Sequence, residues 1–303
     1  MAFFTRRIRV SPRRPLILTV LTLSLLAGSS SPVAARFCFT QIDVPGAIET
    51  MALGVNEGVI VGAYRDANGL HGFRRDPNGA VTPIDVPNAL ETEARGINTQ
   101  KRIVGRYTDA NFISHGFRLS PEGKITTIDV PGATATVASA IDRDGRIVGH
   151  YTDADALDHG YLLKDGAFQT LDAPGGLCGT QLFTIAGHHL SHHRIRIGGS
   201  FSDCSTHHGF VSGGTLDIPG ALSTMVYGIK RKLIVGDYVD VNGKSHGFKL
   251  RRSHISFRTI DFPGAVETHA RGIARFSKGI VGWHVDAFGK THGWQAFLQR
   301  PQC

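Results

Sequence analysis

The sequence predicts an all-β protein, a six-bladed β-propeller of four-stranded antiparallel blades closed by its N-terminal strand. Three observations predict this fold: a short motif recurs at a fixed period, each period has the pattern of several strands, and the two chain ends are out of phase with the repeat. The motif is Ile-Asp-Val-Pro-Gly or a close variant, and it begins at Ile42, Ile84, Ile128, Leu171, Leu216 and Ile260. These starts are 42, 44, 43, 45 and 44 residues apart, and such a period is typical of repeat architectures.

Each period contains four short apolar stretches separated by turns rich in Gly, Asn and Asp. In the second repeat we expect strands at 91–98, 102–107, 115–119 and 124–130, which is a four-stranded meander. Pro131 cannot donate to a ladder and ends the last strand. One such sheet cannot bury both of its faces, but six sheets can do so by packing around an axis. The alternative, a β-solenoid, would prefer shorter coils.

The chain starts and ends out of phase with the repeat, which favours a closed ring. Residues 37–43 match the fourth strand of the other repeats, and residues 292–298 match the third strand. The last blade therefore lacks a fourth strand, and the N-terminus supplies it. We expect residues 36–303 to form a single domain of six repeats, with residues 36–43 completing the sixth blade.

The first 35 residues have the pattern of a secretory signal peptide that is removed. Five Arg precede a short apolar run at 16–27, and Val33-Ala34-Ala35 is a small-residue cleavage site. The run is too short to span a bilayer, and we expect no membrane span elsewhere. The protein is therefore predicted to be exported, extracellular or periplasmic. Thr5-Arg6-Arg7 leaves twin-arginine export open beside the Sec route.

The formal charge of +8 falls to +3 without these residues, because 28 Lys and Arg then face 25 Asp and Glu. This excess is too small to indicate a nucleic-acid partner or an anionic lipid surface.

Four Cys remain in the exported part, so disulfides are expected. Aligning the repeats places Cys38 and Cys303 at the start of the same strand. It also places Cys178 and Cys204 on the same rim. We therefore predict the pairs Cys38–Cys303 and Cys178–Cys204.

Two polar residues recur in every repeat on either side of the hairpin loop between strands two and three. The pairs are Asp66 and His71, Asp109 and His115, Asp153 and His159, Asp203 and His208, Asp240 and His246, and Asp286 and His292. Paired strands bring such residues face to face, so we interpret them as a structural clamp. Metal sites or a catalytic dyad are the alternative, but a single active site does not need six copies.

Two further residues recur at the linker between blades. A Thr opens the first strand at Thr50, Thr92, Thr136, Thr180, Thr224 and Thr268. This Thr follows the Asp of the Ile-Asp-Val-Pro-Gly motif by seven or eight residues. We expect both side chains to cap the linker.

Function is expected where the repeats differ, because the repeated residues are explained by the blade itself. First strands lie closest to a propeller axis, and their variable positions include Glu93, Arg95, Tyr227, His269 and Arg271. We predict that these five residues form a polar pore mouth that binds ligand. Ordinary solvation of a rim is the alternative.

The fourth repeat carries an insertion with His188, His189, His192 and His193. Pairs of His four residues apart could bind a transition metal if the segment were helical. A solvated loop is the alternative, since no nearby carboxylate or Cys completes a site.

The repeat resembles the HAF family of probable extracellular repeats, named after a His-Ala-Phe triplet. Here the triplets begin at His71, His115, His159, His208, His246 and His292, and the central residue is Gly in all six. The resemblance implies an exported protein and brings no activity, ligand or catalytic residue.

These observations favour an exported, non-catalytic binding module for a glycan or another envelope protein. We expect a monomer that needs no cofactor and binds no nucleic acid. One alternative is a propeller enzyme acting on a glycan or small ester, although the sequence lacks a Ser-His-Asp motif and an H-E-x-x-H motif. The other is a purely structural envelope protein.

Overall fold

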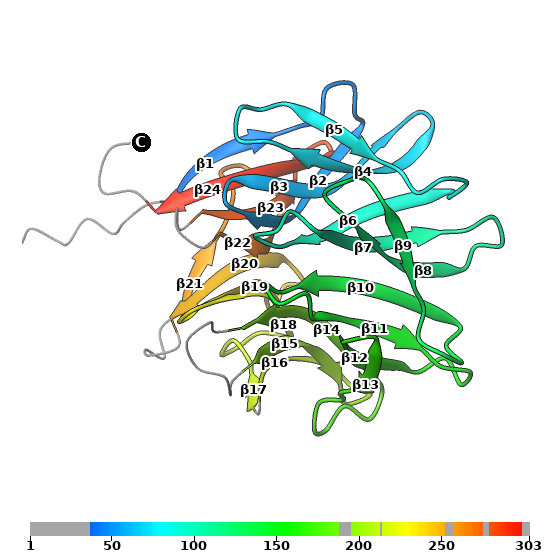
Figure 1. Cartoon of the computed structure of the whole chain (residues 1–303). Helices are drawn as coiled ribbons and strands as arrows, with labels where there is room; N and C mark the ends of the chain where they lie inside the picture. The colour runs from blue at the N-terminus through cyan, green and yellow to red at the C-terminus, as the bar shows by residue number, and fades with distance from the viewer. Residues whose placement is uncertain (1–36, 188–194, 213, 252–256, 275–278, 299–303) are drawn as a thin grey trace, which may run out of the picture. The chain divides into compact units, whose positions relative to one another are not determined.

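The computed structural model describes residues 37–187, 195–212, 214–251, 257–274 and 279–298. They all belong to one compact unit, Ala35–Cys303, and their regular structure consists of β-strands (Figure 1). The predicted signal peptide at 1–35 lies outside the described residues. Within them, no helix has the length and apolar character needed to cross a membrane.

Four four-stranded antiparallel sheets and one eight-stranded sheet follow one another along the chain. A single parallel bridge, between Leu70 and Glu91, joins the two antiparallel halves of the eight-stranded sheet. The chain therefore has six four-stranded antiparallel units, and each corresponds to one predicted blade. Blade one holds β2 (Glu49–Asn56), β3 (Val59–Asp66), β4 (Gly69–Arg75) and β5 (Val81–Ile84). Blade two holds β6 (Glu91–Ile97), β7 (Ile103–Thr108), β8 (Ser114–Leu119) and β9 (Ile125–Ile128). Blade three holds β10 (Ala135–Ile141), β11 (Ile147–Thr152), β12 (Asp158–Lys164) and β13 (Ala167–Thr170).

The remaining three blades follow the same order. Blade four holds β14 (Thr180–Ala186), β15 (Arg196–Ser202), β16 (His207–Val211) and β17 (Gly214–Leu216). Blade five holds β18 (Ser223–Lys230), β19 (Leu233–Val239), β20 (Ser245–Arg251) and β21 (Phe257–Ile260). Blade six holds β22 (Glu267–Ile273), β23 (Ile280–Val285), β24 (Thr291–Leu298) and the N-terminal strand β1 (Phe37–Ile42).

The two ends of the described chain are paired in blade six. Strand β1 runs antiparallel to β24, with Cys38 opposite Phe297 and Gln41 opposite Trp294. Figure 1 shows the blue β1 beside the red β24. The predicted closure by the N-terminal strand is confirmed.

The first strands of the blades form a closed series. Each of β2, β6, β10, β14, β18 and β22 contacts the next, and β22 contacts β2 again. A closed series of sheets whose first strands meet is a β-propeller. These six strands therefore surround its axis.

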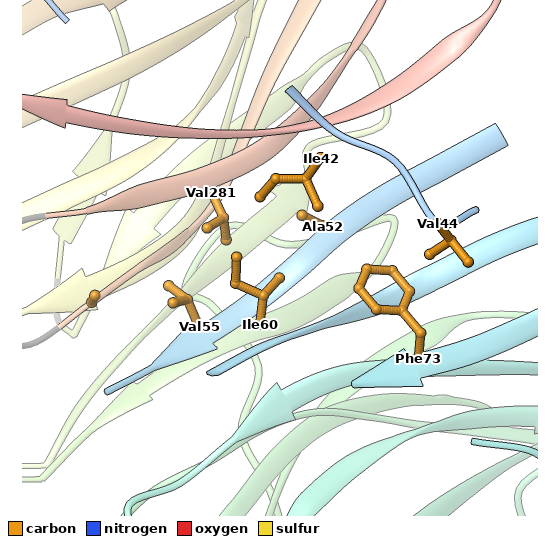
Figure 2. Close-up of a cluster of buried hydrophobic side chains, with 8 residues drawn as sticks. Ile42, Val44, Ala52, Val55, Ile60, Phe73 and Val281 are labelled. Carbon is orange, nitrogen blue, oxygen red and sulfur yellow. The ribbon is translucent and has the colours of Figure 1, made fainter. Parts of the chain in front are cut away.

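The apolar core lies between adjacent blades. In Figure 2, Phe73 and Ile60 of blade one share a buried cluster with Val281 of blade six. The aromatic residue of each His-Gly-aromatic triplet fills such a cluster, at Phe73, Phe117, Tyr161, Phe210, Phe248 and Trp294. The central Gly has a steric reason: at Gly160, for example, an added Cβ would lie 2.4 Å from the carbonyl oxygen of Leu171. A residue with a Cβ at this position would require the backbone of Leu171 to shift.

Every first strand carries a β-bulge at the same place. The extra residue has no partner in the ladder, and in the six blades it is Leu53, Arg95, Ser139, Phe183, Tyr227 and Arg271. A bulge bends its strand and re-aims the side chain of the extra residue. The bulges therefore single out one variable position per blade.

Charge is strongly segregated between the two rims of the propeller. We call the linkers and the strand two–three hairpins, with two strand residues on each side, the acidic rim. Its described residues include three cations, Arg65, Lys244 and Lys290. Its seventeen carboxylates are Asp43, Glu49, Asp66, Asp85, Glu91, Asp109, Asp129, Asp153, Asp155, Asp158, Asp172, Asp203, Asp217, Asp240, Asp261, Glu267 and Asp286.

The opposite rim has the reverse charge. We call the strand one–two and three–four hairpins, with two strand residues on each side, the basic rim. Its described carboxylates are Glu57, Asp76, Glu122, Asp142, Asp144 and Asp165. Its fifteen cations are Arg74, Arg75, Lys101, Arg102, Arg118, Lys124, Arg143, Arg146, Lys164, Arg196, Lys230, Arg231, Lys232, Arg251 and Arg258.

The disulfide between Cys178 and Cys204 is present, with a Cα–Cα distance of 5.0 Å. It joins the linker before β14 to the following strand two–three hairpin, as predicted. Cys303 lies outside the described residues, so its pairing with Cys38 stays a prediction.

Candidate ligand-binding cavity

The bulged first strands surround a central cavity of about 500 Å³. Residues of β2, β6, β10, β14, β18 and β22 all line it, so every blade contributes. Five of the side chains in its wall are Glu93, Arg95, Phe183, Tyr227 and Arg271. Residues that differ from blade to blade therefore meet at the axis.

A buried carboxylate held by two guanidinium groups forms one part of the wall. Glu93 has a side chain only 10% exposed, and its Oε2 accepts a hydrogen bond of 2.9 Å from Nε of Arg95. Its other oxygen accepts from Arg106 on the neighbouring strand. Burial would raise the pKa of Glu93, but Arg95 and Arg106 outweigh it and lower the pKa to about 2. Glu93 is therefore an ionised acceptor and not a proton donor at neutral pH.

A second buried carboxylate, Asp237, lies behind the opposite part of the wall. It accepts hydrogen bonds of 2.8 Å from the ring of His269 and from the backbone N–H of Ala270. Arg271 Nη2 lies 3.3 Å from the same carboxylate. These bonds fix the Arg271 side chain at the cavity surface.

Aromatic rings continue the wall from Arg271 across three blades. The Arg271 guanidinium lies 3.7 Å from the centre of the Tyr227 ring, and Tyr227 stacks on Phe183 at 4.6 Å. Phe183 in turn meets His150 edge to face at 6.2 Å. On the other side, the ring of His269 stacks on Trp283 at 3.7 Å. The cavity thus has an aromatic arc facing a charged segment.

The fixed charge at the cavity is positive. Among the residues that line it, Arg95, Lys230 and Arg271 outnumber the one carboxylate, Glu93. Burial, assisted by the charge of Arg95, lowers the pKa of His150 to about 4, so His150 is neutral at pH 7. Forked guanidinium donors beside flat aromatic faces can bind a polar ligand that has both hydroxyl oxygens and apolar ring faces.

Four of the five residues predicted to form the pore mouth line this cavity, namely Glu93, Arg95, Tyr227 and Arg271. The structure places His269 behind that lining, where it orients Asp237 and supports Trp283.

Sequence reasoning missed the second-strand residues that face the same site, Arg106, His150, Asp237 and Trp283. A signal for them exists in the sequence. The second strands read Val-Gly-x-Tyr or a close variant, and the residue x varies as Ala63, Arg106, His150, Ser200, Asp237 and Trp283. Each x pairs with a variable first-strand residue, as Glu93 does with Arg106.

The repeated His residues lie between two carboxylates in every blade. In blade three, His159 Nε2 lies 3.2 Å from Asp153, as the clamp predicts, while Nδ1 lies 2.8 Å from Asp172 of the linker. Each of the other five His residues also lies near a hairpin Asp and a linker Asp. The linker Asp, which we expected to cap the linker, therefore binds the His instead.

The repeated Thr does cap the linker. Its Oγ1 accepts a hydrogen bond from the backbone N–H of the residue after the linker Asp, as Thr50 does from Val44 at 3.1 Å. The same bond recurs at the other five linkers. Hairpin and linker are thus tied down without any ligand.

The His-rich insertion, with His188, His189, His192 and His193, lies outside the described residues. Within the described ranges, no group of three or more His, Cys, Asp or Glu is placed to hold a metal ion.

No family model matches this chain, and no curated protein matches its sequence. Solved structures do match its fold. AofleA from Arthrobotrys oligospora is 11% identical, with a TM-score of 0.55 and 85% of each chain covered. The Aleuria aurantia lectin, solved with alpha-methyl-L-fucoside, is 13% identical, with a TM-score of 0.50 over 84% of this chain and 93% of the lectin.

A Trypanosoma rangeli sialidase, solved with sialic acid, is 8% identical, with a TM-score of 0.55 over 83% of this chain and 54% of the sialidase. At such low sequence identity, these structural matches establish a shared β-propeller fold and nothing about ligands.

Proposed function

We propose that this protein is an exported, non-catalytic β-propeller that binds a sugar-sized polar ligand in its central cavity. The main support for this proposal is that residues which are not repeated from blade to blade meet in one cavity. Glu93, Arg95, Tyr227 and Arg271 come from three blades, and all four line the same cavity. The blade itself needs none of them, because the repeated Thr, Asp and His residues already tie each hairpin and linker.

The chemistry of the wall favours a carbohydrate over an apolar ligand. Stacked aromatic rings offer flat apolar faces, and guanidinium groups offer donors in a fixed fork. Arg271 supplies the donors beside the aromatic arc, and its guanidinium covers one face of the Tyr227 ring. An entirely apolar ligand would leave these donors desolvated and unpaired.

The carboxylates at the cavity are poorly suited to acid–base chemistry, which supports a binding role. Hydrolysis of a glycoside usually needs one carboxyl with a raised pKa and a second acting as base or nucleophile. Glu93 has the opposite property, because two guanidinium groups lower its pKa to about 2. Asp237 already accepts bonds from His269 and Ala270.

Export and membership of the HAF-type repeat proteins complete the proposal. They are supported by the leader-like residues 1–35 and by the six His-Gly-aromatic triplets. Mass spectrometry of the exported protein should find a new N-terminus near Arg36. An unprocessed chain retained in the cytoplasm would contradict this part.

The experiment is calorimetric titration of the mature protein with a panel of neutral and acidic mono- and disaccharides. Lys keeps the positive charge beside Glu93 and Asp237 but lacks the planar fork, so Arg95→Lys and Arg271→Lys test recognition with little loss of fold. Each change should weaken binding about tenfold, or about 1.4 kcal/mol. Arg118→Lys, on the outer part of blade two, is the matched control. Equal affinity in all three variants, or no binding to any sugar, would contradict the proposal.

A further inference from the structure

The net charge of the chain conceals two oppositely charged rims. The described part of the basic rim carries fifteen Lys and Arg against six carboxylates, whereas the acidic rim carries three against seventeen. Charges gathered on one face create a local potential that a small net charge does not reveal. The weak overall excess therefore does not argue against a polyanionic partner at the basic rim.

Several carboxylates of the basic rim are already neutralised within their own hairpins. Arg146 lies 2.6 Å from Asp142 and 2.8 Å from Asp144, and Arg74 lies 2.7 Å from Asp76. These pairs remove negative charge that would oppose an anionic ligand. Exposed cations remain, and Arg143, Arg231 and Lys232 project from the inner hairpins of blades three and five.

The inner hairpins also enclose a second cavity of about 200 Å³ at this rim. Its wall includes Arg143, Lys230 and Arg231, together with Asp142 and Asp144, which both pair with Arg146. Cationic side chains therefore border a hollow that is large enough for one small anionic group. This cavity is distinct in most of its lining from the central one, which is centred on the bulges.

The described part of the basic rim lacks the exposed apolar side chains that insertion into a bilayer would use. All nine large apolar residues that are exposed in the described ranges lie on the acidic rim, with Phe288 at 95% and Phe112 at 81% the most exposed. A flat bilayer surface could not reach into the hollow between the inner hairpins, but a flexible chain could place a charged group there. We propose that the basic rim is a second binding surface, which takes a linear anionic polysaccharide.

The test measures binding of the mature protein to polygalacturonate at two salt concentrations, with neutral dextran as the uncharged polymer. Cations that neutralise a polyanion release its counterions, so affinity should fall at least about tenfold between about 50 and 200 mM NaCl. The triple change Arg143→Gln, Arg231→Gln and Lys232→Gln should weaken binding at least about fivefold at the lower salt and flatten the salt dependence.

A matched triple change removes the same number of charges from the acidic rim: Arg65→Gln, Lys244→Gln and Lys290→Gln. Binding to polygalacturonate should be nearly unchanged in this control. Equal losses in the two triples, or no binding to the polymer, would overturn the proposal. Binding to phosphatidylglycerol vesicles without binding to the polymer would overturn it in favour of a lipid surface. Arg95→Lys should leave this binding intact, which separates it from the sugar site.

Discussion

At the scale of single residues, the repeated His shows how the clamp is built. Its Nδ1 faces the linker Asp and its Nε2 the hairpin Asp, and the ring stacks on the preceding aromatic residue in most blades, as His159 does on Tyr151. The hydrogen bond to Asp172, and then that to Asp153, raises the pKa of His159 above 6.5. The hydrogen bond to Asp217 raises the pKa of His208 in the same way.

These shifts predict how stability depends on pH. A His with a raised pKa in the folded state binds its proton more tightly there, so its stabilisation is complete below pH 6.5 and is lost as the pH rises through the folded pKa. The hairpin Asp residues act in the opposite sense. Backbone hydrogen bonds lower the pKa of Asp109, Asp153 and Asp240 below 3.8, so their stabilisation is lost as the pH falls through the lowered values.

His150 and His284 act in the opposite sense, because their lowered pKa values make the folded state gain stability as the pH rises toward neutrality. We therefore predict that His159→Asn removes one loss of stability above pH 6.5, so that the slope of the free energy of unfolding against pH is more positive in the variant than in the wild type. Urea denaturation of the wild type and the variant at several pH values measures it. His207 precedes the repeated His208 and has no place in a clamp, so His207→Asn is the matched control and should keep the wild-type slope. A variant at His159 with an unchanged slope would show that the clamp does not titrate in this range.

At the scale of the strand, the bulge on each first strand and the glycine opposite it on the second strand depend on each other. The bulge at Arg95 turns the preceding carbonyl of Glu93 toward β7, where a Cβ added to Gly105 would lie 1.8 Å from that oxygen. The corresponding Gly of blade three, Gly149, is equally close to the carbonyl oxygen of Val137. The cavity side chains are thus aimed by a backbone geometry that requires Gly on the second strand.

Gly105→Ala should therefore destabilise the fold by about 3 kcal/mol, because a backbone carbonyl cannot move aside as a flexible side chain can. Gly214→Ala is the control: an added Cβ there meets no atom within 4 Å, so its effect should stay within about 0.5 kcal/mol. Urea denaturation of both variants measures the difference. Similar stability of the two would mean that the second-strand glycines are not required by the bulge.

At the scale of the whole molecule, the repeat made the fold predictable, and it also limits what sequence can say about the site. The period located all six blades, and the offset of 37–43 against 292–298 predicted which strands meet in the last one. Both ends of each of the strands β6 to β9 lie within two residues of the predicted positions.

The site was only partly predictable, for a physical reason. Variation along the first strands pointed to Glu93, Arg95, Tyr227, His269 and Arg271. The bulge that decides which of these side chains enters the cavity is a feature of strand pairing and has no separate sequence signature. The contribution of the second strands required knowing which residues sit opposite each other, as Arg106 does opposite Glu93.

The two rims are likewise invisible in the composition. Residues of one sign alternate along the chain with residues of the other, because consecutive hairpins point to opposite ends of the blade. The order of the strands separates the two kinds of charge, because it places the linkers and the strand two–three hairpins at one end of each blade and the remaining hairpins at the other end. A net charge of +3 in residues 36–303 thus coexists with two strongly charged surfaces.

Residues that occur once each are proposed to form a binding site inside the propeller. A crystal structure of residues 36–303 with the tightest-binding sugar of the panel will show whether they do. The sugar should lie in the central cavity, with its ring against Phe183 and its hydroxyl groups bonded to Arg95 or Arg271. A sugar held only by the outer hairpins, with the central cavity free of ligand, would contradict this proposal.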